Sequence, residues 1–261
     1  MPEKVKTLLA IDIGNTNTVV GLFKNSKLVH SWRITTVRER TSDEHGVLVK
    51  NLLSLSGFDK LKVNEIAISC VVPPLLPSIK KMSVKYFQCE PFVVQPGIKT
   101  GMPILYEHPQ EVGADRIVNS VAGFQEYGGP CIVIDLGTAT TFDAVSKKGQ
   151  YLGGIISPGI LISSEALFQR AAKLPRVEIR EPEEVIGRNT VSAIQSGIFY
   201  GYLGLIEKII DVMQKELGGN AVTVATGGLA GLIASRTEKI QHVDPDLILK
   251  GLYILNEMNR A

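Results

Sequence analysis

The residues best suited to chemistry in this chain lie in two short polar loops, each of which follows a buried apolar run. In "LLAIDIGNTNTVVGLF", an Asp-x-Gly at 12–14 precedes four small polar residues at 15–18. A turn between two strands needs only one or two such residues, so a simple Gly-Asn turn leaves part of the group unexplained. In "IVIDLGTATTFDAV", a second Asp-x-Gly at 135–137 repeats the pattern a little under half the chain length further on. Repetition on that scale predicts two similar subdomains, each contributing one loop.

These loops are typical of a phosphate clamp. Glycines let the backbone approach a ligand closely, and the hydroxyl, amide and main-chain N–H groups beside them suit phosphate oxygens. Asp12 and Asp135 carry the same charge sign as phosphate, so they make sense if a cation lies between, and Mg²⁺ takes one or two carboxylates together with phosphate oxygens and waters. The residues therefore predict a nucleotide clamp in a cleft between two subdomains.

Other nucleotide motifs do not fit. The sequence contains neither G-x-x-x-x-G-K-[ST] nor, after any strand, G-x-G-x-x-G, which excludes a P-loop and a dinucleotide-binding fingerprint. Gly227 and Gly228 follow an apolar strand and precede a helix. They either admit a nucleoside against bare backbone or serve a C-capping or packing role, and the residues leave both readings open.

Apolar patterns predict the elements that position these loops. We expect strands over 7–13, 18–23, 27–34, 65–72, 91–95, 151–159 and 221–226, and a hairpin over 130–146. We expect a helix that begins at Ser42, with the Ser42 side chain as its N-cap. Its apolar face would be formed by Val47, Leu48, Leu52, Leu53 and Leu55. We expect further helices that end near 86, span 114–127, begin at about 160, span 192–217 and begin at about 245. Each half has strands first and helices after, which predicts an α/β fold with mixed sheets.

The composition excludes several classes of protein. The chain has 261 residues, 44% of them hydrophobic, and a formal net charge of +2, so we expect no nucleic-acid partner. Three widely separated cysteines and four scattered histidines give neither a disulfide framework nor a zinc site. Without a signal peptide or a membrane-length apolar run, we expect a cytoplasmic protein with no membrane partner.

The motifs, in order, resemble those of the actin, sugar-kinase and chaperone ATPase superfamily: "DIGNTNT", then "DLGTATT", then "TGG". Within it the chain closely resembles type III pantothenate kinase, on "GADRIVNSVAGF" (113–124), "IDLGTATTFD" (134–143), "GGIISPG" (153–159) and "NTVSAIQSG" (189–197). The resemblance implies two ribonuclease-H-like subdomains, here 1–127 and 128–261, that close over ATP. It also implies ATP-dependent phosphorylation of pantothenate to 4'-phosphopantothenate, the first step of coenzyme A biosynthesis.

The resemblance also implies roles for individual residues. Asp115 would be the catalytic base, although a carboxylate in the first turn of a helix is also common for stability alone. For Arg116 the residue type itself leaves two roles open: its guanidinium fork could pair with the substrate carboxylate, or it could form a surface salt bridge. The further pantothenate contacts would be Tyr106, Gly113, Ala114 and Thr190, together with Asp115. The ATP contacts would be Asp12, Ile13, Gly14, Asn15, Thr16, Asn17, Thr18, Val19 and Thr138.

The cations and the assembly are expectations of the same kind. The resemblance makes Asp135 the ligand of a monovalent cation, K⁺ or NH₄⁺, and we place Mg²⁺ near Asp12. The residues themselves suggest Mg²⁺ at both, and they do not separate the two cations. We expect a homodimer whose pocket is completed by the second subunit. Two helices carry apolar surface that a partner could cover, although both could instead pack inside one subunit. The residues are Ile117, Val118, Val121, Ala122 and Phe124 on the first helix, and Ile194, Ile198, Phe199, Tyr202, Leu205 and Ile209 with Gly197, Gly201 and Gly204 on the second.

Two alternative functions stay open at this stage. The chain could be a non-catalytic regulatory protein of the same fold, because fold does not fix function. It could also be another small-molecule kinase of the superfamily, or a polyphosphate hydrolase. The complete "GADR" and both phosphate loops favour the pantothenate kinase.

Overall fold

A computed structural model describes residues 5–260, which form two compact units. The first unit comprises residues 5–102, 108–122 and 246–260, and the second comprises 103–107 and 123–245. Within the described residues, no helix is long and apolar enough to cross a membrane.

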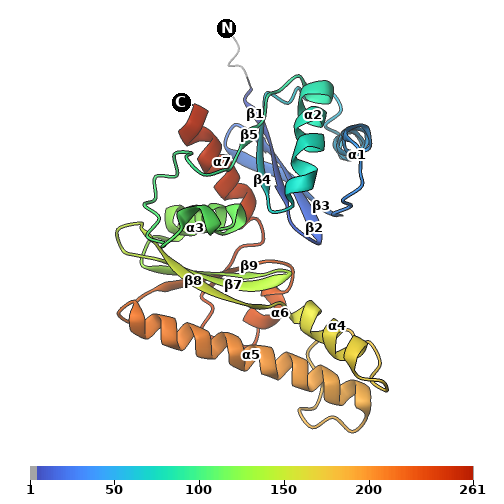
Figure 1. Cartoon of the computed structure of the whole chain (residues 1–261), viewed down its shortest axis with the longest axis vertical. Helices are drawn as coiled ribbons and strands as arrows, with labels where there is room; N and C mark the ends of the chain where they lie inside the picture. The colour runs from blue at the N-terminus through green and yellow to red at the C-terminus, as the bar shows by residue number, and fades with distance from the viewer. Residues whose placement is uncertain (1–4, 261) are drawn as a thin grey trace. The chain divides into compact units, whose positions relative to one another are not determined.

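The first unit is built on a mixed five-stranded sheet with the order β3-β2-β1-β4-β5 (Figure 1). Its strands are β1 (Thr7–Ile13), β2 (Asn17–Lys24), β3 (Lys27–Thr35), β4 (Glu65–Cys70) and β5 (Phe92–Val93). Strands β1, β2 and β3 pair antiparallel, whereas β4 runs parallel to both β1 and β5. Strand β4 ends at Cys70, two residues short of the predicted end, because the 3₁₀ turn Pro73–Leu75 follows at once.

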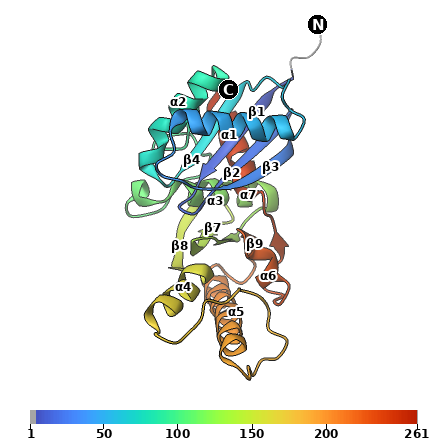
Figure 2. The ribbon, with the colours of Figure 1, turned by 90° about the vertical axis from the view of Figure 1, so that its right-hand side faces the viewer.

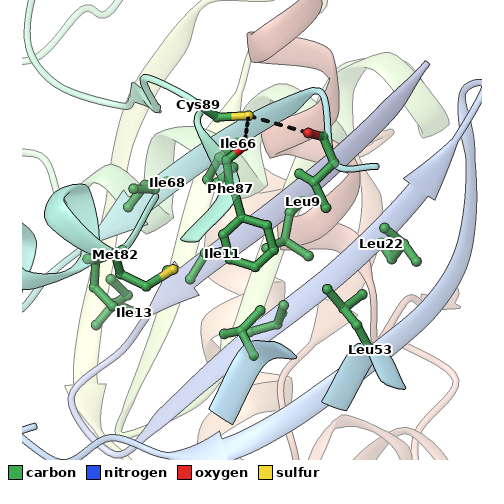
Figure 3. Close-up of a cluster of buried hydrophobic side chains, with 14 of the residues drawn as sticks. Leu9, Ile11, Ile13, Leu22, Leu53, Ile66, Ile68, Met82, Phe87 and Cys89 are labelled. Carbon is green, nitrogen blue, oxygen red and sulfur yellow. Dashed lines mark hydrogen bonds between the residues drawn. The ribbon is translucent and has the colours of Figure 1, made fainter. Parts of the chain in front are cut away.

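Helices cover both faces of this sheet. Helices α1 (Ser42–Leu55) and α2 (Leu76–Phe87) pack against each other and against the face that carries Leu9, Ile11 and Ile13 (Figures 2 and 3). On the other face lies α7 (Leu247–Arg260). Leu249 of this helix packs against Gly21, and the ring of Tyr253 stacks on that of Phe23 with the ring centroids 4.9 Å apart. The alternation of strand side chains therefore makes both faces of β1 part of a buried core.

Helix α7 departs from the predicted division at 127/128. The sequence places residues 245–261 with the second subdomain, but α7 contacts β1, β2 and β4 of the first unit. Helix α3 (Ala114–Tyr127) divides between the units after Ala122. The last helix returns to the first sheet because its apolar face fills the side that α1 and α2 leave uncovered.

The start of α1 corrects one prediction. The helix begins at Ser42, but its N-cap is Thr41, whose side chain accepts from the amide of Glu44 while Glu44 bonds back to Thr41. The predicted apolar face is also wrong in part, because Val47 and Leu55 are 52% and 88% exposed. The buried residues of α1 are His45, Gly46, Val49 and Leu53.

The second unit repeats the first sheet. Its order is β10-β9-β6-β7-β8, formed by β6 (Cys131–Leu136), β7 (Ala139–Val145), β8 (Tyr151–Pro158), β9 (Val222–Thr226) and β10 (His242–Val243). Strands β6, β7, β8, β9 and β10 occupy the positions that β1, β2, β3, β4 and β5 have in the first sheet. In both sheets the first of these strands pairs antiparallel with the second and parallel with the fourth. The structure thus confirms the internal repeat and the α/β class with two mixed sheets.

One side of the second sheet is covered by helices α4 (Ile160–Arg170), α5 (Thr190–Glu216) and α6 (Ala230–Ala234), which share a core with β6 and β7. The helix expected after Gly228 is the short α6, whereas no sequence pattern predicts the strand β10 or the 3₁₀ turn Pro109–Glu111. The long helix α5 starts two residues earlier than expected, behind the N-cap Asn189.

Candidate active site

The first polar loop joins β1 to β2 and is held tightly. The amide of Gly14 donates to the carbonyl of Asn17 at 3.0 Å, and a Cβ on Gly14 would lie 2.9 Å from that same oxygen. Thr36, just beyond β3, bonds the Gly14 carbonyl at 2.8 Å and the Thr18 hydroxyl at 2.9 Å. The loop therefore presents a fixed backbone, and Thr36 is a supporting residue that no sequence motif indicates.

Side chains in this loop point in different directions. Asn15 and Thr16 are exposed, while Thr18 is buried. Ile13 belongs to the core beneath α1 and α2, so only its main chain can meet a ligand. Asp12 is half-buried near the end of β1. Burial raises the pKa of the neighbouring Cys70 thiol, the hydrogen bond to the Val72 carbonyl partly opposes this, and the Asp12 charge adds a smaller increase.

The "GADR" segment at the start of α3 forms a compact carboxylate site. Asp115 accepts from the Arg116 amide at 2.8 Å, and Arg116 is buried at 7% exposure. A Cβ on Gly113 would lie 2.5 Å from Asp115 Oδ1, so the glycine leaves room for the carboxylate. Burial raises the pKa of Asp115, an effect that the Arg116 amide and charge only partly oppose. A carboxylate of raised pKa takes up a proton more readily than an exposed one.

The second polar loop, in the other unit, joins β6 to β7 and is packed by glycines. The amide of Gly159 donates to the Thr138 carbonyl at 3.1 Å, and a Cβ on Gly159 would lie only 2.3 Å from that oxygen. Asp135, at the end of β6, pairs in register with Thr141 and Thr226. Asp135 thus has the same position in its sheet as Asp12, which pairs with Val19 and Ser69.

The glycine pair after β9 divides its roles. Gly227 has a φ of 95°, and a Cβ there would lie 2.7 Å from both Asp135 Oδ1 and the Leu136 carbonyl oxygen. Only a glycine fits this close approach. Gly228 has open space at its Cβ position. Next to the pair, a cavity of about 690 Å³ is lined by Leu229, residues of α4 and the segment 176–179.

The remaining predicted substrate residues also lie in the second unit. Tyr106 packs beside Tyr151, with ring centroids 6.3 Å apart, and above Gly153. Thr190 is the exposed first residue of α5, directly after the N-cap Asn189. The first unit thus brings together Gly113, Asp115 and Arg116, and the second brings Asp135 and Thr138 together with Gly159 and Gly227.

The fold is shared with solved structures of low sequence identity. A chain described as a Baf family transcriptional activator from Campylobacter jejuni matches with a TM-score of 0.61 at 20% identity, covering 96% of this chain and 98% of that one. The activator of the 2-hydroxyisocaproyl-CoA dehydratase from Clostridium difficile, solved with bound ADPNP, matches with a TM-score of 0.55 at 12% identity, covering 97% and 95%. At these identities the likeness shows the fold alone, an actin-like α/β architecture of two related mixed sheets.

Sequence relatives define the family. The family model for type III pantothenate kinase matches residues 8–212. Type III pantothenate kinases from Myxococcus xanthus and Syntrophus aciditrophicus are 55% and 54% identical, and each match covers 97% of this chain and 99% of the relative. The chain belongs to the type III pantothenate kinase family and is an enzyme, a phosphotransferase. This membership confirms the resemblance read from the motifs and favours the kinase over both alternative functions.

Proposed function

We propose that the chain transfers the γ-phosphoryl group of ATP to the primary hydroxyl of pantothenate, with Asp115 as the proton acceptor. In this step the hydroxyl oxygen bonds to the γ-phosphorus, the bond from that phosphorus to the β,γ-bridging oxygen breaks, and ADP leaves. The hydroxyl proton passes to Asp115. The observation that carries the proposal is the environment of this carboxylate, with a pKa raised by burial and room cleared by Gly113.

The ATP side uses main-chain groups more than side chains. The tight turn at Gly14 and the exposed Asn15 and Thr16 offer amides and hydroxyls to phosphate oxygens, and Thr138 does the same in the second loop. The cavity that Leu229, α4 and the segment 176–179 line suits the nucleoside, because apolar side chains such as Leu161, Ile162 and Leu229 form part of its wall. Gly228, the neighbour of Leu229 in the chain, has open space at its Cβ position.

The cations follow from the carboxylates. No group of three His, Cys, Asp or Glu gathers as a metal cage anywhere in residues 5–260. That fits Mg²⁺, which is held by one or two carboxylates with phosphate oxygens and waters, here with Asp12. When bound, Mg²⁺ neutralises charge on the transferring phosphoryl group. At Asp135, the carboxylate and the Leu136 carbonyl face the same side of Gly227, an oxygen donor set suited to K⁺ or NH₄⁺.

The pantothenate side draws on the remaining family motifs. The planar guanidinium of Arg116 suits the substrate carboxylate. Tyr106, Gly113, Ala114 and Thr190 complete the set, and Thr190 stands exposed at the first turn of α5. All three cysteines are free, which together with ATP as co-substrate supports a cytoplasmic location.

The proposed homodimer rests on α5 and no longer on α3. In α3, residues Ile117, Val118, Val121 and Ala122 are buried within the chain itself. In α5, by contrast, Gly197, Gly201 and Gly204 are exposed, and a Cβ at each would meet open space. This glycine stripe leaves a helix face that a second subunit can approach closely.

One experiment tests the reaction and the assembly together. The purified protein is incubated with ATP, Mg²⁺ and K⁺ and with either pantothenate or a panel of sugars, and the products are identified by mass spectrometry. Phosphopantothenate as the only product supports the proposal, and a phosphosugar contradicts it.

The assembly is tested by dilution, with specific activity followed by assay and molecular mass by light scattering. Both should fall together if the second subunit completes the pocket. A monomer with full activity at every dilution contradicts the shared pocket.

A further inference from the structure

The second unit buries a carboxylate and a phenol to which no role has been assigned above. Asp143 on β7 is 1% exposed and Tyr151 on β8 is 0% exposed. The Tyr151 hydroxyl donates to Asp143 Oδ1 at 2.8 Å. A buried carboxylate is unfavourable unless its hydrogen bonds are made. This bond therefore fixes the orientation of the Tyr151 side chain.

Tyr151 in turn holds the segment that carries Tyr106. Its amide donates to the Pro103 carbonyl at 2.9 Å, and its carbonyl accepts from the Leu105 amide at 2.8 Å. Ile104 thereby forms a parallel bridge to Tyr151. The segment is an irregular extension of the sheet, and Tyr151 of β8 makes two main-chain hydrogen bonds to it.

The Tyr106 ring rests on the same residue and its neighbour. Its centroid lies 6.3 Å from that of Tyr151, with the ring planes tilted by 51°. Gly153, with a φ of 120°, provides a surface without a side chain, and a Cβ there would lie 3.6 Å from the Tyr106 ring. The aromatic contact and the backbone bonds together determine where Tyr106 lies.

We propose that Asp143 and Tyr151 are positioning residues for Tyr106 and that, through it, they set the affinity for pantothenate. The proposal rests on the proposed contact between Tyr106 and pantothenate. The charge-assisted bond holds the Tyr151 ring in the orientation against which Tyr106 packs. Removing the phenol oxygen leaves the backbone bonds in place but frees the ring, so the segment 103–107 loosens without unfolding.

The test compares two phenylalanine variants that remove the same kind of bond. Tyr151→Phe removes the bond to Asp143, and Tyr127→Phe removes the bond from Tyr127 to Asp244 Oδ2, which is 2.9 Å long. The first readout is hydrogen exchange at the Leu105 amide, which does not depend on activity. We expect at least tenfold faster exchange in Tyr151→Phe and an unchanged rate in Tyr127→Phe. Equal exchange rates in wild type and Tyr151→Phe overturn the positioning role.

The second readout is a double-mutant cycle with Tyr106→Ala. We expect Tyr151→Phe to raise the KM for pantothenate three- to tenfold with less than a twofold change in the KM for ATP, and Asp143→Asn to act in the same direction. In the Tyr106→Ala background, Tyr151→Phe should have no further effect on the KM for pantothenate. A full additional increase there overturns the proposal, because Tyr151 would then act without Tyr106. If Tyr106→Ala itself leaves the KM for pantothenate unchanged, the proposed Tyr106 contact fails, while the exchange result still decides the positioning role.

Discussion

The carboxylate of Asp115 occupies the space that a side chain on Gly113 would need, with Oδ1 only 2.5 Å from the position of a Cβ. That separation is far shorter than a van der Waals contact. Gly113 does not have the positive φ that favours glycine, so the requirement for glycine here comes from the carboxylate. The glycine and the aspartate of "GADR" are therefore one structural unit.

Gly113→Ala should displace the Asp115 carboxylate and lower kcat at least tenfold, because misplacing a proton acceptor by a fraction of an ångström weakens proton transfer. The KM for ATP should change less than twofold. The matched control is Gly231→Ala in α6, where a Cβ meets nothing within 4 Å. Steady-state kinetics check both variants, and a normal kcat in Gly113→Ala would contradict the steric argument.

Asp115→Asn should lower kcat by about 10²- to 10⁴-fold, the usual loss of a general base. It should also stabilise the protein at neutral pH. Because burial raises the pKa of this carboxyl above 3.8, its contribution to stability is present below that value and is lost as pH rises through the folded-state pKa. Thermal unfolding should therefore give a higher Tm for the variant at pH 7.5 and a smaller difference near pH 4. A lower Tm for the variant at pH 7.5 would contradict the assignment of burial as the main cause.

Much of the scaffold could be predicted because its signals are local. Both Asp-x-Gly hairpins and α3 lie where the alternating and helical patterns put them, since those patterns reflect burial within each element. The sequence also contains a signal for the N-cap of α1, because Thr41 and Glu44 have capping-box spacing. Ser42, beside Thr41, is an equally good cap by residue type. Only the extended backbone of Thr41 and its bonds to Glu44 decide between them.

Residues joined across the sheet could not be predicted. Thr36 supports Gly14 from beyond β3, 22 positions away, and no motif links them. Asp143 and Tyr151 meet across a hairpin whose register shifts at Ala144, so counting along the strands does not pair them. Contacts of this kind depend on tertiary geometry, which is why the sequence gives the loops but not what holds them.

Asp12→Ala should raise the KM for MgATP at least tenfold, because a carboxylate beside a triphosphate is favourable only through a cation. The matched control is Asp43→Ala, an exposed carboxylate that bonds Lys85 at 2.8 Å on the surface of the same unit. Kinetics over a range of Mg²⁺ concentrations should show a weaker Mg²⁺ response in Asp12→Ala only. Identical Mg²⁺ curves for the wild type and Asp12→Ala would remove Asp12 from the nucleotide site.

Replacing K⁺ by Li⁺ at equal ionic strength should lower wild-type activity severalfold, because Li⁺ is too small for an oxygen set arranged for K⁺. Asp135→Asn should lose most of this difference, since the amide no longer supplies a charged ligand. Gly227→Ala should lose it too, because its Cβ would lie 2.7 Å from Asp135 Oδ1. Activity assays in the two salts decide the point, and a wild type indifferent to the ion would rule out the monovalent site.

His45 should make the protein less stable in acid. Its side chain is 4% exposed, its Nε2 makes no hydrogen bond to the residues that the structure describes, and burial lowers its pKa from 6.5 to about 4, with the Arg40 charge adding to the effect. The His45 imidazole therefore takes up a proton below about pH 6.5 in the unfolded chain but only below about pH 4 in the folded chain. The free energy of unfolding accordingly falls as pH drops through this interval. The loss of stability is of order 1–3 kcal/mol.

Thermal unfolding at pH 7.5 and 4.5 should show a smaller drop in Tm for His45→Leu than for the wild type. The control His30→Leu, at an exposed site, should show the same drop in Tm as the wild type. Parallel pH curves for wild type and His45→Leu would show that this histidine does not control acid stability.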